Sequence, residues 1–480
     1  MKTKRIATQI SLFSAAMVLG FGGGCSSNTE AESGNNGTGG QAGGSAGQGA
    51  GIGFDGSVGA SGAPGAAGTG GGGLDGSLAE FCSGSGTVVT IGDKQTCTGQ
   101  VASSIFKYAL CSCSDLQVNG SLTTDGFDSS QPQDPAKNGA AVGVNKEFHV
   151  NGMSSVGGSL FVAGTPLLGL NGNHTIAGDF QTNSTTVFVS GGSVQVGRDA
   201  WVAGDILGGQ AVTVARDLHQ PAGKQGTSVN VGQKRVVGPV NVAAPCNCQQ
   251  KLDIGALVAS FKNNNDNATV GLDPDALANV VGDRQVTLDC GRFYVNSIGG
   301  AGKLVINVPK RVALFVGGDV FMSGQAQVNL GEQGEIDIFV AGDFIVNGDT
   351  KFGDPARPAG TRVYVDGSKA IGLNGTSAFV GNLFAPHAMV VSNVNLEVFG
   401  SIYANGFVGN NWVKIHYDKG ILKAGDQCKV PPNKCNTCGD CGSEQACKGG
   451  ACTTCSADAD CCPPLICYQN GKCGPLVIPR

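Results

Sequence analysis

The sequence predicts an all-β fold, a single-stranded parallel β-helix, from its glycine content, its short alternating apolar runs and a repeat near 20 residues. Of the 480 residues, 80 are glycine, whereas aromatic residues make up 6 % and charged residues 14 %. Glycine loses much backbone entropy on folding and buries no side chain, which excludes a helical bundle or a helix-rich doubly wound enzyme. The hydrophobic content of 41 % still allows a sizeable core.

The strands are predicted from about residue 115 onward, where runs of Val, Ile, Phe and Leu alternate with polar residues and end at glycine. From Gly158 to Gly178 and from Gly178 to Arg198 is 20 residues each. One small unit recurs, as in GGSLFVAG (157–164), AGDF (177–180), GRDAWVAGDI (197–206), AGDFIVNG (341–348) and GSIYANG (400–406). This repeat is too short for a propeller blade and suits one coil of a β-helix. An antiparallel β-sandwich with glycine turns is the alternative.

The N-terminus has the layout of a secretion signal. Three basic residues among the first five precede a mostly apolar, uncharged stretch, residues 6–21, which is too short to span a bilayer. Gly22-Gly23-Gly24-Cys25 follows and resembles the end of a bacterial lipoprotein signal, so we expect signal removal after residue 24 and lipidation of Cys25. The alternative is an ordinary secretion signal. Residues 26–76 contain 20 glycines, and we expect 25–76 to be a flexible tether.

Two helical segments are predicted inside a β-helix domain that spans residues 77–427. Residues 98–110 carry apolar side chains near helical spacing, and we expect a short helix that plugs the N-terminal end of the solenoid. Residues 246–290 interrupt the repeats as a small helical insert. Leu252, Leu257, Val258 and Phe261 indicate one helix there, and Asp273-Pro274 can begin another.

Export also predicts that the cysteines other than Cys25 form disulfides. The 11 cysteines of residues 428–480 indicate a small disulfide-rich module, and Cys428 can pair backwards into the solenoid because seven cysteines, an odd number, lie between 82 and 290. The disulfide candidates are Cys82, Cys97, Cys111, Cys113, Cys246, Cys248, Cys290, Cys428, Cys435, Cys438, Cys441, Cys447, Cys452, Cys455, Cys461, Cys462, Cys467 and Cys473. Cys435, Cys438 and Cys441 have the spacing of iron–sulfur cluster ligands. The export signal favours disulfides instead, so neither a cofactor nor a metal is expected.

Two stretches resemble known families. Phe384-Ala385-Pro386, Gly400-Ser401-Ile402-Tyr403-Ala404 and Ile415-His416-Tyr417-Asp418 are similar to the closing coils of an uncharacterised β-helical domain of bacterial surface proteins, some of them pilus-associated. This resemblance implies a right-handed β-helix at the cell surface and implies no reaction. The tail, Cys455–Cys467, resembles Dickkopf-like or colipase-like disulfide-rich modules.

Few residues suggest catalysis or metal binding. Aspartates recur at one place in the repeat (Asp179, Asp199, Asp205, Asp217, Asp319 and Asp343), and we interpret them as turn residues, because calcium-binding repeats would need successive nine-residue units. His416 lies beside Tyr417 and Asp418, which could form an acid–base cluster. We expect these three residues to close a terminal coil by hydrogen bonding instead, and no catalytic residue is predicted.

The sequence therefore predicts a lipid-anchored protein of the bacterial envelope, at the outer membrane or cell surface, with a structural, adhesive or binding role. Its expected partners are the membrane, through the lipid, and an extracellular polysaccharide or a surface protein. A net charge of −5 gives no basic face, so nucleic acid is not expected as a partner. The alternatives are a surface-attached polysaccharide lyase or hydrolase, since β-helices often carry such activity, and a pilus-associated component.

Overall fold

The predicted parallel β-helix is confirmed. The computed structural model describes residues 78–83, 88–91, 94–131, 139–249, 252–348, 350–374, 378–424, 445–448, 451–461, 465–469 and 471–475. Every described strand pair between residues 110 and 418 is parallel, which is incompatible with the antiparallel sandwich. Outside the described residues lie the expected signal and tether, Cys25, Cys428, Cys435, Cys438, Cys441 and Cys462.

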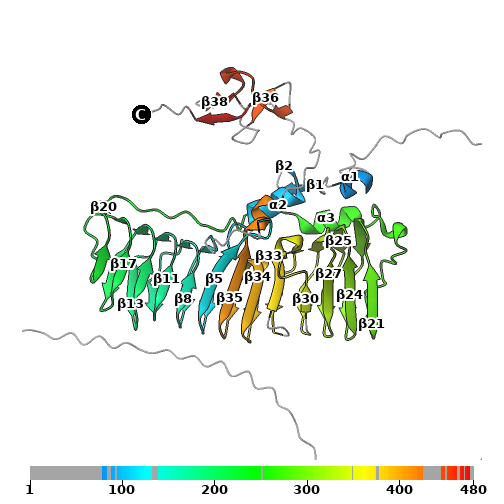
Figure 1. Ribbon diagram of the computed structural model, residues 1–480, viewed down its shortest axis with the longest axis horizontal. Coiled ribbons are helices and arrows are strands. Elements are labelled where there is room, and N and C mark those ends of the chain that lie inside the picture. Colours follow the sequence, from blue (N-terminus) through cyan, green and yellow to red (C-terminus); the bar gives the residue numbers. More distant parts are fainter. Residues whose placement is uncertain are drawn as a thin grey trace, which may run out of the picture. The chain divides into compact units, whose positions relative to one another are not determined.

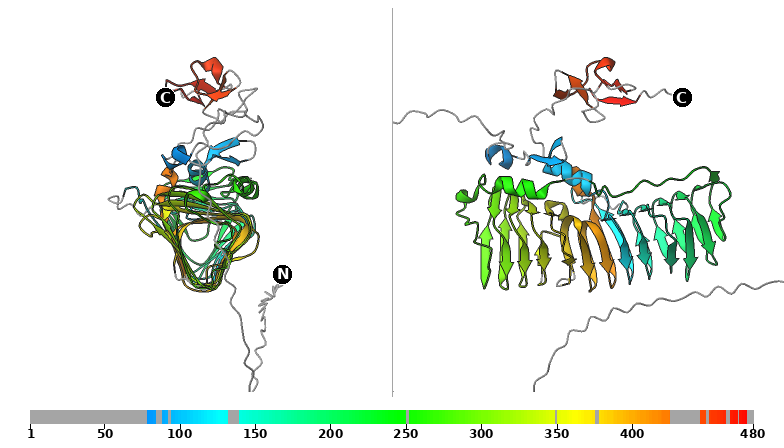
Figure 2. Two further views of the ribbon diagram at one scale, coloured as in Figure 1. Left: turned by 90° about the vertical axis from the view of Figure 1, so that its right-hand side faces the viewer. Right: turned by 180° about the vertical axis from the view of Figure 1, so that it is seen from behind.

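Most coils contribute three strands, which stack in register on those of the neighbouring coils to form three long faces (Figures 1 and 2). Face 1 contains thirteen strands, in spatial order β22 (Gly291–Val295), β25 (Arg311–Val316), β28 (Glu335–Val340), β31 (Thr361–Val365), the middle of β33 (Ala378–Ser392), the middle of β34 (Leu396–Gly409), β3 (Leu110–Ser112), β6 (Val142–Val144), β9 (Leu160–Val162), β12 (Phe180–Thr182), β15 (Ala200–Val202), β18 (Leu218–Gln220) and β20 (Arg235–Val237).

The other two faces repeat this order. Face 2 contains β23 (Ile298–Gly300), β26 (Val320–Met322), β29 (Phe344–Val346), β32 (Ile371–Gly372), the last parts of β33 and β34, β4 (Leu116–Val118), β7 (Phe148–Val150), β10 (Leu168–Asn171), β13 (Thr186–Ser190) and β16 (Asp205–Gly208). Face 3 contains β21 (Asp283–Thr287), β24 (Lys303–Val308), β27 (Ala326–Leu330), β30 (Thr350–Phe352), the first parts of β33 and β34, β35 (Val413–Asp418), β5 (Leu122–Phe127), β8 (Ser154–Val156), β11 (His174–Ile176), β14 (Val194–Val196), β17 (Val212–Val214) and β19 (Val229–Val231).

Many of these strands are only three residues long, with an apolar–polar–apolar pattern. In β14, Val194 and Val196 are buried and Gln195 is exposed. Alternate side chains of a strand point to opposite sides, so the two valines enter the interior and the glutamine faces outward. Register places Val194 between His174 and Val212 of the adjacent coils, which makes the interior one continuous core.

Glycine is required where successive coils approach closely. Gly400 has a φ of +128°, and a Cβ atom there would lie 2.0 Å from the carbonyl oxygen of Gly381. Gly381, its partner in the preceding coil, also has a positive φ. An L side chain rarely adopts this conformation, which explains part of the high glycine content.

The coils are not stacked in chain order. A first run, residues 110–237, begins in the middle of the solenoid and ends at β20 (Figure 1). The chain then returns along the solenoid as a strap, residues 238–249, and a second run, residues 283–418, begins at the opposite end with β21 and comes back to the middle. The last coil of the second run therefore lies against the first coil of the first run.

We call the contact between the two runs the seam, formed by β34 and β35 against β3, β4 and β5. These strands pair in parallel on all three faces, so the solenoid continues across the chain break. The Tyr417 hydroxyl donates to the carbonyl of Phe106 at 2.7 Å. The buried carboxylate of Asp418 accepts from the N–H of Ser129 at 2.9 Å and from the N–H of Ala359 at 3.0 Å. The bond between Asp418 and Ser129 thus joins the two runs in addition to the sheets, and Tyr417 holds the segment just before β3.

The predicted N-terminal helix forms, but it does not plug an end of the solenoid. It is α2 (Thr98–Ile105), with Val101, Ala102 and Ile105 buried. The strand directly after it, β3, pairs with β34 on one side and with β6 on the other. The first coil in the chain is therefore an internal coil, because the second run occupies the place that we expected to need a cap.

The insert contains one α-helix where two were expected. In α3 (Ile254–Phe261) the side chain of Asp253 accepts from the N–H of Ala256, and Phe261 stacks on Phe315 of face 1 with ring centroids 3.9 Å apart. The prediction of a second helix is wrong. Residues 274–277 form a turn and residue 278 a bend, and the N–H of Val280 donates to the carbonyl of Gly299 in a neighbouring strand. The smaller elements are α1 (Leu78–Cys82), β1 (Val88–Ile91), β2 (Lys94–Cys97), η1 (Asn267–Thr269), η2 (Pro358–Gly360) and η3 (Lys419–Lys423).

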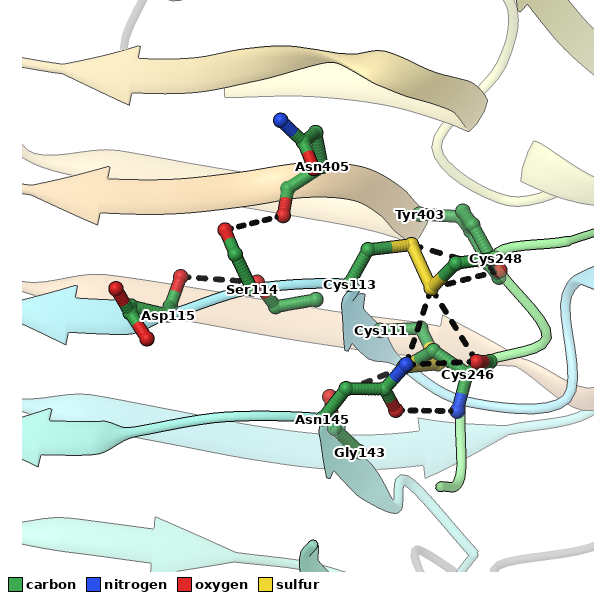
Figure 3. Close-up of a disulfide and its surroundings, with 11 residues drawn as sticks. Cys111, Cys113, Ser114, Asp115, Gly143, Asn145, Cys246, Cys248, Tyr403 and Asn405 are labelled. Carbon is green, nitrogen blue, oxygen red and sulfur yellow. Dashed lines mark hydrogen bonds between the residues drawn. A yellow bond between two sulfur atoms is a disulfide. The ribbon is translucent and has the colours of Figure 1, made fainter. Parts of the chain in front are cut away.

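Two disulfides fix the end of the strap to the seam (Figure 3). Cys111 pairs with Cys246 and Cys113 pairs with Cys248. Next to them, Asn145 donates through Nδ2 to the carbonyl of Cys246 at 2.8 Å and accepts its N–H at 3.0 Å. The side-chain amide of Asn145 thus makes the pair of hydrogen bonds with the strap backbone that a neighbouring strand would make in a sheet.

The strap is held a second time further along the first run. Asn183 makes the same reciprocal pair with the backbone of Val242, with both hydrogen bonds at 2.7 Å. Val242 is buried. The strap is therefore part of the packed structure, although it belongs to none of the three faces.

The remaining described disulfides lie at α1 and in the C-terminal module. Cys82 of α1 pairs with Cys290, just before β22, and Cys97 is also disulfide-bonded. The module contains the hairpins β36 (Ala446–Lys448) with β37 (Ala451–Thr453) and β38 (Leu465–Cys467) with β39 (Cys473–Pro475), and η5 (Asp458–Asp460). Its disulfides include Cys455–Cys467 and Cys461–Cys473, and Cys447 and Cys452 are disulfide-bonded as well.

Candidate functional site: an outward polar row on face 3

Face 3 of the first run presents one polar side chain per coil at its centre. Register places these residues directly above one another, in the order Thr123, Ser155, Thr175, Gln195, Thr213 and Asn230. All except the half-buried Thr123 are exposed. Neighbouring strands of a sheet lie about 4.8 Å apart, so we describe this polar row as a ladder of hydroxyl and amide groups with that spacing.

The exposed side chains of the polar row have no side-chain partner within the described part of the chain. Among the described residues, no side-chain hydrogen bond or ion pair involves Ser155, Thr175, Gln195, Thr213 or Asn230. Hydroxyl and amide groups both donate and accept hydrogen bonds and carry no charge. Sequence reasoning missed this row, although its signal is visible: the middle residue of SSV, HTI, VQV, VTV and VNV is polar in every coil.

The recurrent aspartates, by contrast, are used by the fold. The carboxylate of Asp179 accepts the N–H of Asp199 at 3.3 Å, Asp199 accepts the N–H of Asp217 at 2.9 Å, and Asp217 accepts the N–H of Lys234 at 3.0 Å. In the second run, Asp319 accepts the N–H of Asp343 at 2.8 Å. Each carboxylate thus satisfies a backbone donor of the next coil, and not the N–H two residues on that the turn interpretation expected.

The histidine cluster expected near residue 416 has different members. His416 points outward on β35, where its Nδ1 lies 2.7 Å from Asp125 of the first run and its Nε2 lies 3.0 Å from Glu397 of β34. Its ring stacks on Phe399 with centroids 4.7 Å apart. The hydrogen bond to Asp125, supported by Glu397, raises the pKa of His416, and the bond from His416 lowers the pKa of Glu397.

This triad is a clamp across the seam. Both ring nitrogens of His416 are occupied by carboxylates, which leaves neither nitrogen free to move a substrate proton. The expected partners, Tyr417 and Asp418, are buried and bind other groups, because alternation along β35 sends Tyr417 to the opposite side from His416. The sequence-adjacent acid–base cluster is therefore not formed.

A second charged cluster is largely buried on face 1 of the second run. Arg362 is buried, and it donates to Asp337 and, from Nη2 at 3.0 Å, to Glu335. Its Nη1 donates to the carbonyl of Ala359. Burial disfavours the charge of Arg362, but Asp337 and Glu335 raise its pKa above the ordinary value. These carboxylates are thus committed to a buried ion pair and are not an open catalytic pair.

A buried histidine faces a serine of the preceding coil inside the solenoid. His174 occupies a core position on β11, and its Nδ1 lies 2.7 Å from the hydroxyl of Ser154 in the preceding coil. Its Nε2 is buried and has no hydrogen-bond partner within the described part of the chain. Burial lowers the pKa of His174, so the ring is neutral near pH 7. The pair resembles a nucleophile and its base, but it is enclosed by the core.

Few other described groups could hold a ligand. Trp201 on face 1 stacks on His219 with centroids 4.7 Å apart, and both are half-buried. One cluster of three potential metal ligands occurs among the described residues, Cys455, Cys461 and Cys467, and these sulfurs are in disulfides. No described helix is long and apolar enough to cross a membrane. The polar row is therefore the best candidate for a functional surface.

One family model matches part of the chain. Residues 244–423 match the model of a family described as a domain of unknown function (DUF7305). This range covers the end of the strap, the insert and the second run. A comparison with curated protein sequences finds no match.

One solved structure is similar in part, an ice-binding protein from an Antarctic bacterium of the Flavobacteriaceae. It is 11 % identical, and the alignment covers 67 % of this chain and 98 % of that chain with a TM-score of 0.20. A TM-score this low carries no inference about function.

Proposed function

We propose that this chain is an exported, envelope-attached binding protein whose β-helix holds an extracellular polysaccharide along face 3. The polar row carries this proposal, because five consecutive coils each present an exposed hydroxyl or amide without an intramolecular partner among the described residues. A chain of sugars offers hydroxyl groups at regular intervals. Single hydrogen bonds to such groups are weak, but contacts repeated along one rigid face add up by multivalency.

Attachment to the envelope rests on the N-terminal sequence. The basic residues, the apolar stretch and Gly24-Cys25 support lipidation of Cys25 and a place at the outer membrane or cell surface. The glycine-rich tether would hold the β-helix away from the membrane. The cysteine pattern Cys455–Cys467 supports a Dickkopf-like or colipase-like module at the far end of the chain.

The proposal is tested by binding to a panel of neutral and acidic polysaccharides. The isosteric variant T175V/T213V removes two hydroxyls of the polar row, and we expect it to weaken binding by about tenfold, because each hydrogen bond contributes about 0.5–1.5 kcal/mol. The matched control is T165V, since Thr165 is exposed in a loop outside the row. Equal binding by both variants would contradict the proposal. If instead the wild-type protein partitions into ice and T175V/T213V does not, the ligand of the polar row would be ice and not a polysaccharide.

No catalysis is proposed. The enzymatic alternative needs two open carboxylates about 5–10 Å apart, and the carboxylates considered above are bound to backbone N–H groups, to His416 or to Arg362. Incubation with the same polysaccharides would reveal an enzyme by new reducing ends or unsaturated products. The pilus-associated alternative predicts that the protein co-purifies with filaments, and binding to a surface protein predicts capture by envelope protein after the polysaccharide is removed.

A further inference from the structure

Beside the polar row, the last coils of the first run carry a second outward feature, which we call the basic ridge: Arg198, Arg216 and Lys234. Lys234 lies one residue further along its turn than the arginines, at the position that Asp217 holds in the preceding coil. Arg198 and Arg216 follow Gln195 and Thr213 by three residues in their coils, at the turn from face 3 to face 1. The N–H of Arg216 donates to the carbonyl of Arg198, so the two arginines are stacked in adjacent coils.

The fold does not require this ridge. Backbone hydrogen bonds of the same kind place Gly158 and Gly178 at the equivalent turn position in the two preceding coils. Like charges on adjacent strands repel, so two stacked arginines have an energetic cost. A position that glycine fills in one coil and arginine in the next is therefore explained better by a ligand than by the turn.

Carboxylates lie beside the ridge in each coil, but only that of Asp179 forms an ion pair with it among the described residues. The Nε of Arg198 lies 3.4 Å from Asp179, but no ion pair or side-chain hydrogen bond involves the side chain of Arg216 or of Lys234 within the described part of the chain. The neighbouring carboxylates of Asp199 and Asp217 already accept backbone N–H groups. Residues 218–249 contain no acidic residue.

We infer that the polysaccharide bound along face 3 is anionic, a chain carrying carboxylate or sulfate groups. The inference rests on the proposed function and specifies its ligand. Sugar hydroxyls would bind the polar row while the acidic groups, displaced to one side of the chain, bind the basic ridge. Arginine suits this role, because its guanidinium forms two parallel hydrogen bonds with carboxylate or sulfate.

The test compares alginate, heparin and a neutral glucan with the full chain at low and high salt. We expect the wild type to bind an acidic chain more tightly than the glucan and to lose that advantage at high salt, since exposed charges are screened within about 10 Å at 0.1 M. Alginate and heparin distinguish carboxylate from sulfate as the recognised group. R216Q/K234Q should reduce binding of the acidic chain by about tenfold and leave the glucan unaffected.

The matched control is K262Q/R284Q, which removes the same charge from exposed residues near the opposite end of the β-helix. R216Q/K234Q removes no intramolecular side-chain contact known among the described residues, so circular dichroism should match that of the wild type. Equal binding of acidic and neutral chains, unchanged in R216Q/K234Q, would overturn the inference and leave the proposed function standing. Failure to bind any polysaccharide would overturn both. Binding of duplex DNA as tight as that of alginate or heparin would overturn the carbohydrate assignment.

Discussion

At the scale of single residues, two histidines respond to pH in opposite directions. His416 is held between Asp125 and Glu397 in its charged form, whereas His174 is buried in its neutral form. A group with a raised pKa stabilises the fold when protonated, and a group with a lowered pKa stabilises it when deprotonated. The same residue type therefore supports the seam in mildly acidic solution and weakens the core there.

We expect H416Q to destabilise the protein by about 1 kcal/mol at pH 6, the value of a charge-assisted pair discounted for the partial exposure of both carboxylates. Because the pKa of His416 is raised, this contribution is present below the ordinary value of 6.5 and is lost as pH rises through the raised value. The pKa of Glu397 is lowered, so its share is lost below its own ordinary value of 4.5 as pH falls through the lowered value.

Chemical unfolding at pH 6 and pH 9 measures this difference, which should shrink at the higher pH. The control is H149Q, since His149 is exposed and bonds only its neighbour Glu147 among the described residues. An H416Q effect that stays constant between the two pH values would show that packing against Phe399, and not charge, accounts for the loss.

For the interior pair, we expect the volume-conserving double variant S154A/H174L to flatten the acid side of the stability profile. The pKa of His174 is lowered, so the unfolded chain binds more protons below pH 6.5, and wild-type stability falls as pH decreases from there. The double variant removes both polar partners, so neither is left buried without a hydrogen bond. H174L alone leaves the hydroxyl of Ser154 without its partner and should lower the free energy of unfolding by about 1–3 kcal/mol. Unfolding at pH 7 and pH 5 checks this, and an unchanged slope in the double variant would contradict it.

At the scale of elements, the strap is an extended segment that is ordered by cross-links instead of a sheet. Its two disulfides both span 135 residues but lie only two residues apart, so they close nearly the same loop. In the chain-entropy account, the first bond to close this loop stabilises the fold by about 5 kcal/mol, and the second restricts little more. Either disulfide alone therefore removes most of the unfolded-chain entropy that the two remove together.

Removing either disulfide alone, by C111A/C246A or by C113A/C248A, should lower the free energy of unfolding by only about 1–2 kcal/mol, through lost packing. Removing both should lower it by about 5 kcal/mol beyond that packing loss. Denaturant melts of the three variants measure the non-additivity. Simple addition of the two single losses would show that the disulfides act independently and that loop closure is not the main effect.

At the scale of the whole molecule, the chain break at the seam makes the β-helix a rearranged series of coils. If chain order followed stacking order, the second run would come first and continue directly into the first run. The seam is paired on all three faces, and its strands include β34, one of the longest strands among the described residues. The connection through the strap is therefore not needed to hold the two runs together.

We expect a protein nicked in the strap to remain one particle. A protease site inserted between Ala243 and Ala244, both exposed, would cut the chain between the runs. After cutting and mild reduction of the disulfides, the two fragments should co-elute in size-exclusion chromatography and separate only in denaturant. Separation without denaturant would mean that the seam is weaker than its strand pairing indicates.

Local sequence determined the coils themselves. An apolar–polar–apolar triplet such as Val194–Val196, bounded by glycine, specifies a strand and a turn through side-chain alternation and backbone freedom, and both act within a few residues. The helices α2 and α3 were predictable for the same reason. The repeat placed Asp199 and its equivalents in turns, but it did not predict their hydrogen bonds to the next coil.

Tertiary structure alone decided how the coils are ordered and what faces outward together. β3 pairs with β34 across nearly 300 residues, and the triplets that pair there look like those that pair with their neighbours in the chain, so no local signal distinguishes them. His416 meets Asp125 for the same reason, and the polar row exists only because the register is uniform. Strand pairing depends on contacts between complete coils that lie far apart in the sequence, so the pattern of a single strand does not specify its partner.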